Sequence, residues 1–404
     1  MSGKKKPSPS SPSGKSKASR GQPSSLRRIN IDAIVRKIQI DAPITRSELT
    51  RATELSYPTV MKICDLLLEK KLIEWLPDSD RDGNRRGRPA SYLQMSTSSA
   101  HVIAISFRPS YILAATAGLD GNTIRELRCP IPQTYPEILS SAHRLIKELR
   151  ESDNSPTLGL GLAAPGLLEI GAHTQLTVSS NIPALAEHYI TEDLGKLTNL
   201  PTVIVSTMRS LYNSSIIRGH AVKHEDFAIL NYYAGMGLAV ASNGVYMDGS
   251  QGMAGELGHT IVEPNGKPCG CGNRGCLETL ATDLALAHSI SHKLGRTVPV
   301  DEMVGLIRKS PSRFEEEIDR MLDYLAIAVG MTINIFNPEA ILLYGRLLEI
   351  DDAFFDKLKK KTAATCLKQL ASHCTLKKSK SRTIQGAALA IADELTRQLT
   401  PNIE

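Results

Sequence analysis

One imidazole and three thiols gathered in a glycine-rich stretch constrain this chain more than any other feature. They are His259, Cys269, Cys271 and Cys276. Glycine permits the tight turns that a loop needs to fold around an ion. One histidine and three cysteines are the ligand set of a closed, four-coordinate zinc site, which leaves no position for a catalytic water. The stretch therefore predicts a structural Zn ion. The alternative is a disulfide with a spare thiol and imidazole.

The other cysteines are scattered along the 404 residues, which argues for a reducing compartment and against a disulfide framework. The first 25 residues contain no apolar run that could serve as a signal peptide, and no later segment is long enough to span a bilayer. We therefore expect a cytoplasmic protein without membrane contact. Its length predicts two or three domains with a sizeable core.

Positive charge is concentrated at the N-terminal end. Of the net charge of +6, residues 1–25 contribute +6, residues 26–94 contribute +3 and residues 95–404 contribute −3. This placement is expected if the N-terminal end meets an anionic partner. The composition of residues 1–25, rich in Ser, Pro, Gly and Lys, predicts a disordered tail. A tail that only solubilises the protein is the alternative.

Residues 26–95 show the order helix, short helix, longer helix and β-hairpin. Apolar residues between Ile31 and Ile38 recur at helical spacing. Thr45 and Glu48 form a capping box that opens a helix over 45–52, and Ser56 caps the next helix. Two β-capable runs follow, 72–76 and 90–95. This order predicts a winged helix-turn-helix. A trihelical docking module is the alternative.

Six side chains of this unit are candidate DNA contacts. The third helix would present Tyr57, Thr59 and Lys62 to base edges and phosphates of the major groove. The hairpin loop carries Arg85, Arg86 and Arg88 beside Gly87 and Pro89, a composition suited to a narrow A·T minor groove. The expected partner is a double-stranded DNA operator.

From residue 100 onward, β-runs alternate with helical segments. The expected strands are 101–107, 111–117, 157–163, 203–206, 228–231, 238–241 and 340–343. The expected helices lie near 136–150, 279–294, 314–335 and 384–398. This alternation predicts an α/β region.

Carboxylates flank the candidate metal ligands. Glu256 lies three residues before His259, so on a helical turn both point to one face, and Glu278 follows the last cysteine of the cluster. Together they form an acceptor-rich wall suited to vicinal sugar hydroxyls. A capping or salt-bridge role for the glutamates is the alternative.

The segment Gly-Glu-Leu-Gly-His and the cysteine loop that follows closely resemble the zinc loop of the ROK family of repressors and sugar kinases, and the chain looks like its repressor branch. The resemblance covers about 26–397 and implies two actin-like, ribonuclease H-like lobes with ligand in the cleft. It also implies sugar binding by Glu256, His259, Glu278 and the Asn181 of Ser-Ser-Asn-Ile-Pro.

With this resemblance, the expected fold class is an N-terminal winged helix-turn-helix followed by a two-lobed α/β region with a zinc loop. The expected domains are a tail (1–25), a DNA-binding domain (26–95) and a sugar-sensing domain (96–404). Within the last, the first lobe spans about 96–205 plus the C-terminal helix, and the second spans about 206–380.

The kinases of the family require features that this chain replaces. Ser106–Ser110 stands where they have an Asp-x-Gly-Gly-Thr turn, and Tyr233–Gly235 stands in place of a phosphate loop. Met208 occupies the position of the aspartate base and cannot accept a proton. We therefore expect no enzymatic activity.

The expected function is a sugar- or sugar-phosphate-responsive repressor of carbohydrate-utilisation genes, acting as a homodimer or homotetramer. A divergent sugar kinase with a DNA-binding appendage and a ligand-independent DNA-binding regulator are the alternatives.

Overall fold

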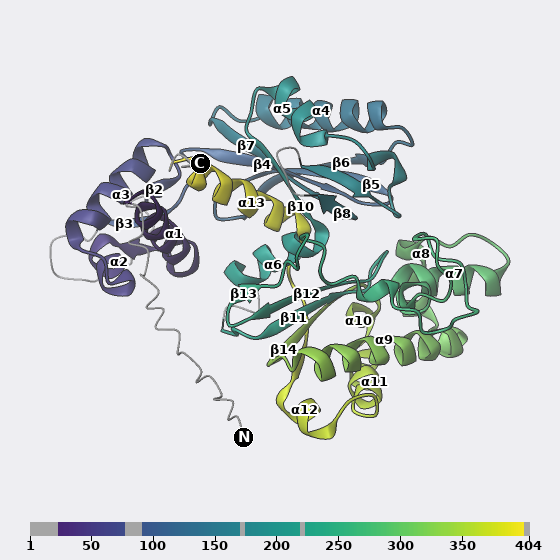
Figure 1. Cartoon of the computed structure of the whole chain (residues 1–404). Helices are drawn as coiled ribbons and strands as arrows, with labels where there is room; N and C mark the ends of the chain where they lie inside the picture. The colour runs from purple at the N-terminus through teal and green to yellow at the C-terminus, as the bar shows by residue number, and fades with distance from the viewer. Residues whose placement is uncertain (1–22, 77–90, 170–173, 219–222, 400–404) are drawn as a thin grey trace, which may run out of the picture.

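The structure is a computed structural model that describes residues 23–76, 91–169, 174–218 and 223–399 (Figure 1). Its N-terminal unit contains α1 (Pro23–Asp41), β1 (Ile44–Thr45), α2 (Arg46–Thr53), α3 (Tyr57–Glu69), β2 (Ile73–Trp75) and β3 (Tyr92–Met95). The strands form an antiparallel sheet in the order β1-β3-β2. Helix α1 begins at Pro23, inside the segment that the composition assigned to the tail. Residues 1–22 of that segment lie outside the described residues.

Local caps explain where the short helices begin. The Thr45 hydroxyl accepts from the Glu48 amide while the Glu48 carboxylate accepts from the Thr45 amide, so the predicted capping box is confirmed. The Ser56 side chain accepts from the Thr59 amide at the start of α3, as predicted. Helix α3 has one buried apolar stripe, formed by Val60, Ile63, Cys64 and Leu67.

The first lobe is a five-stranded sheet in the order β10-β7-β4-β5-β6. Its elements are β4 (His101–Phe107), β5 (Tyr111–Ala117), β6 (Thr123–Pro130), α4 (Tyr135–Glu151), β7 (Thr157–Ala164), α5 (Ile190–Thr198) and β10 (Thr202–Ser206). Strands β10, β7 and β4 are parallel, and β5 and β6 extend the sheet antiparallel. Helices α4 and α5 cover one face, and α13 (Thr383–Arg397) covers the other (Figure 1). A small hairpin, β8 (Leu167–Glu169) with β9 (Gln175–Val178), follows β7.

The second lobe is a sheet in the order β13-β12-β11-β14-β15. Its strands are β11 (Phe227–Asn231), β12 (Gly237–Ser242), β13 (Val245–Tyr246), β14 (Ala340–Tyr344) and β15 (Thr375–Lys378). Its helices are α6 (Thr207–Arg218), α7 (Asp283–Leu294), α8 (Val300–Lys309), α9 (Glu315–Phe336), α10 (Leu347–Ile350), α11 (Asp352–Thr362) and α12 (Lys368–His373). Apolar side chains of α7 to α11 form the core on one face, and α6 packs on the other. The predicted α/β region is therefore confirmed. No described helix is long and apolar enough to cross a membrane.

Helices α6 and α13 pack against each other between the two sheets (Figure 1). A Cβ at Gly386 of α13 would come within 1.7 Å of the Ser210 carbonyl oxygen of α6, so only glycine allows this approach. The Ser210 hydroxyl donates to the Thr383 carbonyl oxygen across the same contact. The two lobes are thus joined at a tightly packed helix pair.

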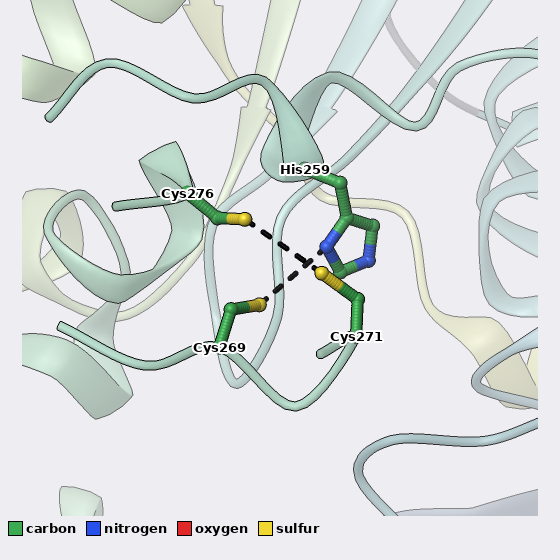
Figure 2. A group of neighbouring side chains, drawn as sticks. All are labelled: His259, Cys269, Cys271 and Cys276. Carbon is green, nitrogen blue, oxygen red and sulfur yellow. Dashed lines mark hydrogen bonds between the residues drawn. The ribbon is translucent and has the colours of Figure 1, made fainter. Parts of the chain in front are cut away.

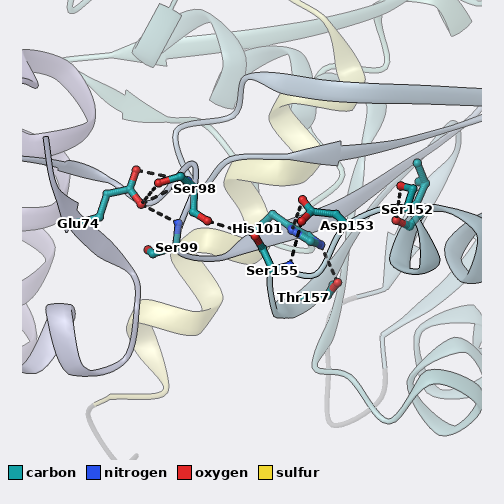
Figure 3. Close-up of polar contacts among 9 residues, drawn as sticks. Glu74, Ser98, Ser99, His101, Ser152, Asp153, Ser155 and Thr157 are labelled. Atoms are coloured by element: carbon teal, nitrogen blue, oxygen red, sulfur yellow. Dashed lines mark hydrogen bonds and ion pairs between the residues drawn. The ribbon is translucent and has the colours of Figure 1, made fainter. Parts of the chain in front are cut away.

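A buried carboxylate ties the N-terminal unit to the first lobe (Figure 3). Glu74 of β2 accepts hydrogen bonds from the backbone amides of Thr97, Ser98 and Ser99, the segment that leads from β3 to β4. Helix α1 also contacts α13, where the Gln39 amide donates to Asp393 Oδ1 at 3.2 Å. The N-terminal unit therefore has fixed polar contacts with the lobes.

Candidate functional site

The cysteine loop is a tight backbone hairpin. The Cys269 amide donates to the Asn273 carbonyl oxygen at 2.8 Å, and the Gly275 amide donates to the Lys267 carbonyl oxygen at 2.8 Å. His259 ends a short 3₁₀ helix, Leu257–His259, and Cys276 immediately precedes another, Leu277–Thr279. Backbone hydrogen bonds therefore bring the separated ligand candidates to one place.

The four predicted metal ligands converge (Figure 2). Their ligand atoms all lie within 4.8 Å of one another, with 3.7 Å between the sulfurs of Cys271 and Cys276. Cys269 Sγ lies 3.6 Å from His259 Nδ1. Zn–S bonds of about 2.3 Å place two tetrahedral sulfurs about 3.8 Å apart, so this donor set fits zinc. A disulfide requires about 2.05 Å, and all seven cysteines are free, so the disulfide alternative is wrong.

Carboxylates surround the imidazole of His259. Its Nε2 lies 3.7 Å from Glu256 Oε2, and its Nδ1 lies 3.7 Å from Glu278 Oε1. The two glutamates therefore face the same ring, as the sequence spacing predicted for Glu256. Burial raises the pKa of Glu256, with the imidazole opposing and Glu278 reinforcing the shift. A carboxylate beside the free nitrogen of a metal-bound histidine would fix its tautomer and orientation.

The same residues form one wall of a cavity of about 230 Å³ between the lobes. All four predicted sugar-binding residues line it: Asn181, Glu256, His259 and Glu278. A Cβ at Gly235 would come within 2.9 Å of Asn181 Nδ2 and 3.4 Å of Glu278 Oε2. The absence of a side chain at Gly235 therefore leaves room for the amide and the carboxylate beside the same stretch of backbone. The two carboxylates of this wall can accept hydrogen bonds from the hydroxyls of a ligand, and the Asn181 amide can both accept and donate.

The replaced kinase positions lie in this cavity as well. Ser106–Pro109, Thr207, Met208 and Tyr233–Gly235 line it. A Cβ at Gly237 would come within 2.8 Å of Met208 Cγ, so the thioether packs on bare backbone. Arg108, Tyr233 and Tyr344 also line the cavity, and the sequence assigned none of them a ligand-binding role. The signal for Arg108 was available, because a charged residue directly after a buried strand is typical of α/β ligand sites.

The candidate DNA contacts lie in the N-terminal unit, apart from the cavity. Tyr57 and Lys62 are exposed on α3, and Thr59 is half-buried with its hydroxyl 2.8 Å from that of Ser56. They lie on the surface of α3, away from its buried stripe. The predicted arginines of the hairpin loop, Arg85, Arg86 and Arg88, lie outside the described residues.

Comparisons with known proteins agree with this architecture. A family model described as the ROK family matches residues 102–394. The chain is 24% identical to the xylose repressor of Bacillus spizizenii over 86% of this chain and 90% of the relative. It is 26% identical to the N-acetylglucosamine repressor of Escherichia coli O157:H7 over 81% of this chain and 82% of the relative.

One solved structure extends the likeness beyond the two lobes. A ROK family transcriptional regulator, described as a homologue of the Escherichia coli Mlc protein, superposes with a TM-score of 0.76 at 21% identity. The match covers 93% of this chain and 98% of that one, so the fold is shared along nearly the whole length.

Proposed function

We propose that this chain, which belongs to the ROK family, is a sugar-responsive DNA-binding transcriptional regulator that represses carbohydrate-utilisation genes in the bacterial cytoplasm. The observation that carries the proposal is the cavity wall formed by Asn181, Glu256, His259 and Glu278, in a chain that also carries a helical N-terminal unit. The relatives named repressors of xylose and N-acetylglucosamine support the same function.

The N-terminal unit is proposed to be a winged helix-turn-helix, with α3 as the recognition helix. Tyr57, Thr59 and Lys62 would face the major groove, while the buried stripe holds α3 to the rest of the unit. Lys62 forms no ion pair within the described ranges, so its ammonium is available to a phosphate or a guanine. The loop with Arg85, Arg86 and Arg88 would enter the adjacent minor groove.

The cavity is proposed to bind its ligand without turning it over. Glu256, Glu278 and Asn181 can accept from or donate to hydroxyls, and His259 would be held by the metal on its Nδ1 side. Phosphoryl transfer requires a base at the reacting hydroxyl, and Met208 provides none there. The chain is therefore proposed to be a sensor and not a kinase.

Zinc is proposed to be the resident metal, held by His259, Cys269, Cys271 and Cys276. The ion would offset the negative charge of the buried Cys269 and Cys276 thiolates, and it would fix a loop whose side chains are mostly exposed. His259 belongs to the donor set and also to the cavity wall, so the metal would hold one ligand-binding side chain in place.

Helix α13 is the proposed connection between cavity and DNA. Its first residue, Thr383, lines the cavity, and Asp393 farther along the same helix contacts Gln39 of α1. A ligand that favours one arrangement of the lobes would shift α13 against α6 and so move α1. In a homodimer or homotetramer this motion would misalign the DNA-binding units with their half-sites.

The test begins with operators selected from random duplexes by the zinc-loaded protein. Fluorescence anisotropy then measures operator affinity with and without xylose, N-acetylglucosamine, glucose and their phosphate esters. We expect one of these ligands to weaken operator binding. Glu256→Gln should reduce the ligand's own affinity about ten- to a hundredfold, because a charged hydrogen bond is lost.

The same variant should still hold stoichiometric zinc and bind operator in the absence of ligand, because all four metal ligands remain in place. Operator binding that no sugar alters would support the ligand-independent regulator. ADP release from ATP in the presence of a sugar would support the kinase.

A further inference from the structure

Arg108 is a cation in the cavity whose protein partners are neutral. It follows β4 directly and is half-buried. Its Nη2 donates to the Tyr344 hydroxyl at 3.0 Å and to Thr383 Oγ1 at 2.9 Å. Its guanidinium carbon lies 5.9 Å from the centre of the Tyr233 ring. These contacts fix the guanidinium at the cavity without compensating its charge.

Hydrogen-bonding capacity on the same guanidinium is unused. Nε is buried without a partner, and Nη1 makes no hydrogen bond to any residue in the described part of the chain. No carboxylate there pairs with Arg108 either. A cation withdrawn from water is normally paired, because its desolvation is otherwise uncompensated.

The neighbouring arginine shows the usual arrangement. Arg382 Nη1 lies 2.7 Å from Glu126 Oε1, and Arg382 Nη2 donates to Glu126 Oε2 at 2.9 Å. Arg382 does not line the cavity, whereas Arg108 does. The arginine without an acidic partner is thus the one that faces the ligand space.

A helix N-terminus adds to the positive potential beside Arg108. Thr383 is the first residue of the 15-residue helix α13, which has no side-chain cap. Its hydroxyl contacts both Arg108 Nη2 and, at 2.8 Å, Ser106 Oγ. The amides at a helix N-terminus carry a partial positive charge and favour an oxyanion. Guanidinium and helix end therefore act on the same region of the cavity.

We propose that the cavity receives an anionic sugar derivative whose oxyanion is bound by Arg108 at the α13 N-terminus. The oxyanion is that of a phosphate ester or a sugar acid, and the sugar hydroxyls face the wall of Asn181, Glu256, His259 and Glu278. This inference rests on the proposed function, since it names the class of ligand for the same cavity. Arginine suits this role because its planar fork can donate to two oxygens at once.

The direct test is calorimetry on the zinc-loaded full chain with matched ligands. Glucose, N-acetylglucosamine and xylose are each compared with a phosphate ester, and glucose also with glucuronate. The wild type should bind one anionic derivative at least tenfold more tightly than its neutral parent. Arg108→Gln should remove that preference, so that the ratio of the two affinities falls to about one. Which derivative binds identifies the oxyanion.

Two further variants separate charge from structure. Arg108→Lys keeps the charge without the fork and should retain part of the preference, and Arg382→Gln should retain all of it. Circular dichroism and zinc content establish that each variant is folded. An Arg108→Gln variant that binds the anionic derivative like the wild type would overturn the inference, as would a wild type that binds only neutral sugars.

If no sugar binds, sugar sensing itself is refuted. Inorganic phosphate still tests the anion site in that case. Phosphate should raise the melting temperature of the wild type above that in chloride of equal ionic strength, because it binds the native state. Arg108→Gln should lose this increase. In the absence of sugar binding, equal melting temperatures in phosphate and chloride would overturn the anion site as well.

Discussion

Substitution of Glu74 by glutamine should loosen the N-terminal unit from the first lobe. The Glu74 side chain is only 7% exposed, and its Oε2 accepts from the Ser98 and Ser99 amides at 3.2 and 2.8 Å. Its Oε1 accepts from the Thr97 amide at 3.0 Å. An amide nitrogen placed at either oxygen position would meet N–H donors instead of accepting from them.

The hydrogen bonds to Glu74 also determine how much stability the substitution removes. Burial opposes ionisation of Glu74, but hydrogen bonds from Ser99, Gln94 and Thr97 overcome it and lower the pKa from 4.5 to about 2. At 1.36 kcal/mol per pKa unit, this difference corresponds to about 3 kcal/mol of stability at neutral pH. Because the folded pKa is depressed, this contribution is complete above pH 4.5 and is lost as the pH falls toward 2.

Trp75 makes the assay specific to this junction. It is the single tryptophan of the chain and follows Glu74 in β2. Urea unfolding followed by its fluorescence should show Glu74→Gln with a midpoint lower by about 1–3 M at pH 7, given typical slopes. The control Glu69→Gln removes an exposed carboxylate at the end of α3 and should change stability by less than about 0.5 kcal/mol.

Acidification provides a second readout of the same prediction. The stability difference between wild type and Glu74→Gln should shrink between pH 4.5 and 2, because the wild-type carboxyl becomes protonated. Equal midpoints for the wild type and Glu74→Gln at pH 7 would show that the Glu74 carboxylate does not stabilise this junction. A difference that persists unchanged at the acidic end would show that the carboxylate charge is not its cause.

Two further predictions concern the metal and the DNA. Cys271→Ser should lose stoichiometric zinc and melt at a lower temperature. Elemental analysis that finds no zinc in wild-type protein purified without chelator would contradict the metal site. Lys62→Ala should weaken operator binding. If Lys62 contacts a phosphate, the salt dependence of the affinity should fall by about one unit of slope. If it contacts a base, the binding free energy should fall by about 1–3 kcal/mol for the operator only. Arg88→Ala should also weaken binding without unfolding the protein, and unchanged gel-shift affinity of both variants would remove the winged-helix assignment of these residues.

Elements with strong local signals could be predicted from the sequence. The expected strands 101–107 and 111–117 coincide with β4 and β5, because both are buried along almost their whole length and read as continuous apolar runs. Thr45 and Ser56 marked the starts of α2 and α3 because capping depends on neighbouring residues alone. The metal cluster was equally local in the sequence.

Elements held by tertiary contacts could not be predicted in this way. The edge strand β6 contains only exposed and half-buried residues and carries three charged side chains, so it was not among the expected strands. Helix α6 lacks a clear apolar stripe because it packs on α13 partly through serines, including Ser210 and Ser214. The cavity also depends on contacts between residues that are distant in the sequence. Arg108 contacts Tyr344 and Thr383, which lie 236 and 275 positions away.

Control of the N-terminal unit by the cavity implies reciprocal coupling between ligand and operator. If the cavity controls the N-terminal unit through α13, the factor by which a ligand weakens operator binding must equal the factor by which operator weakens ligand binding. Calorimetric titration of the ligand into free and operator-bound protein, beside anisotropy with and without ligand, measures both factors. In the wild type we expect the two factors to be equal and well above one. Ligand that binds with the same affinity in both states, while operator affinity stays constant, would contradict it.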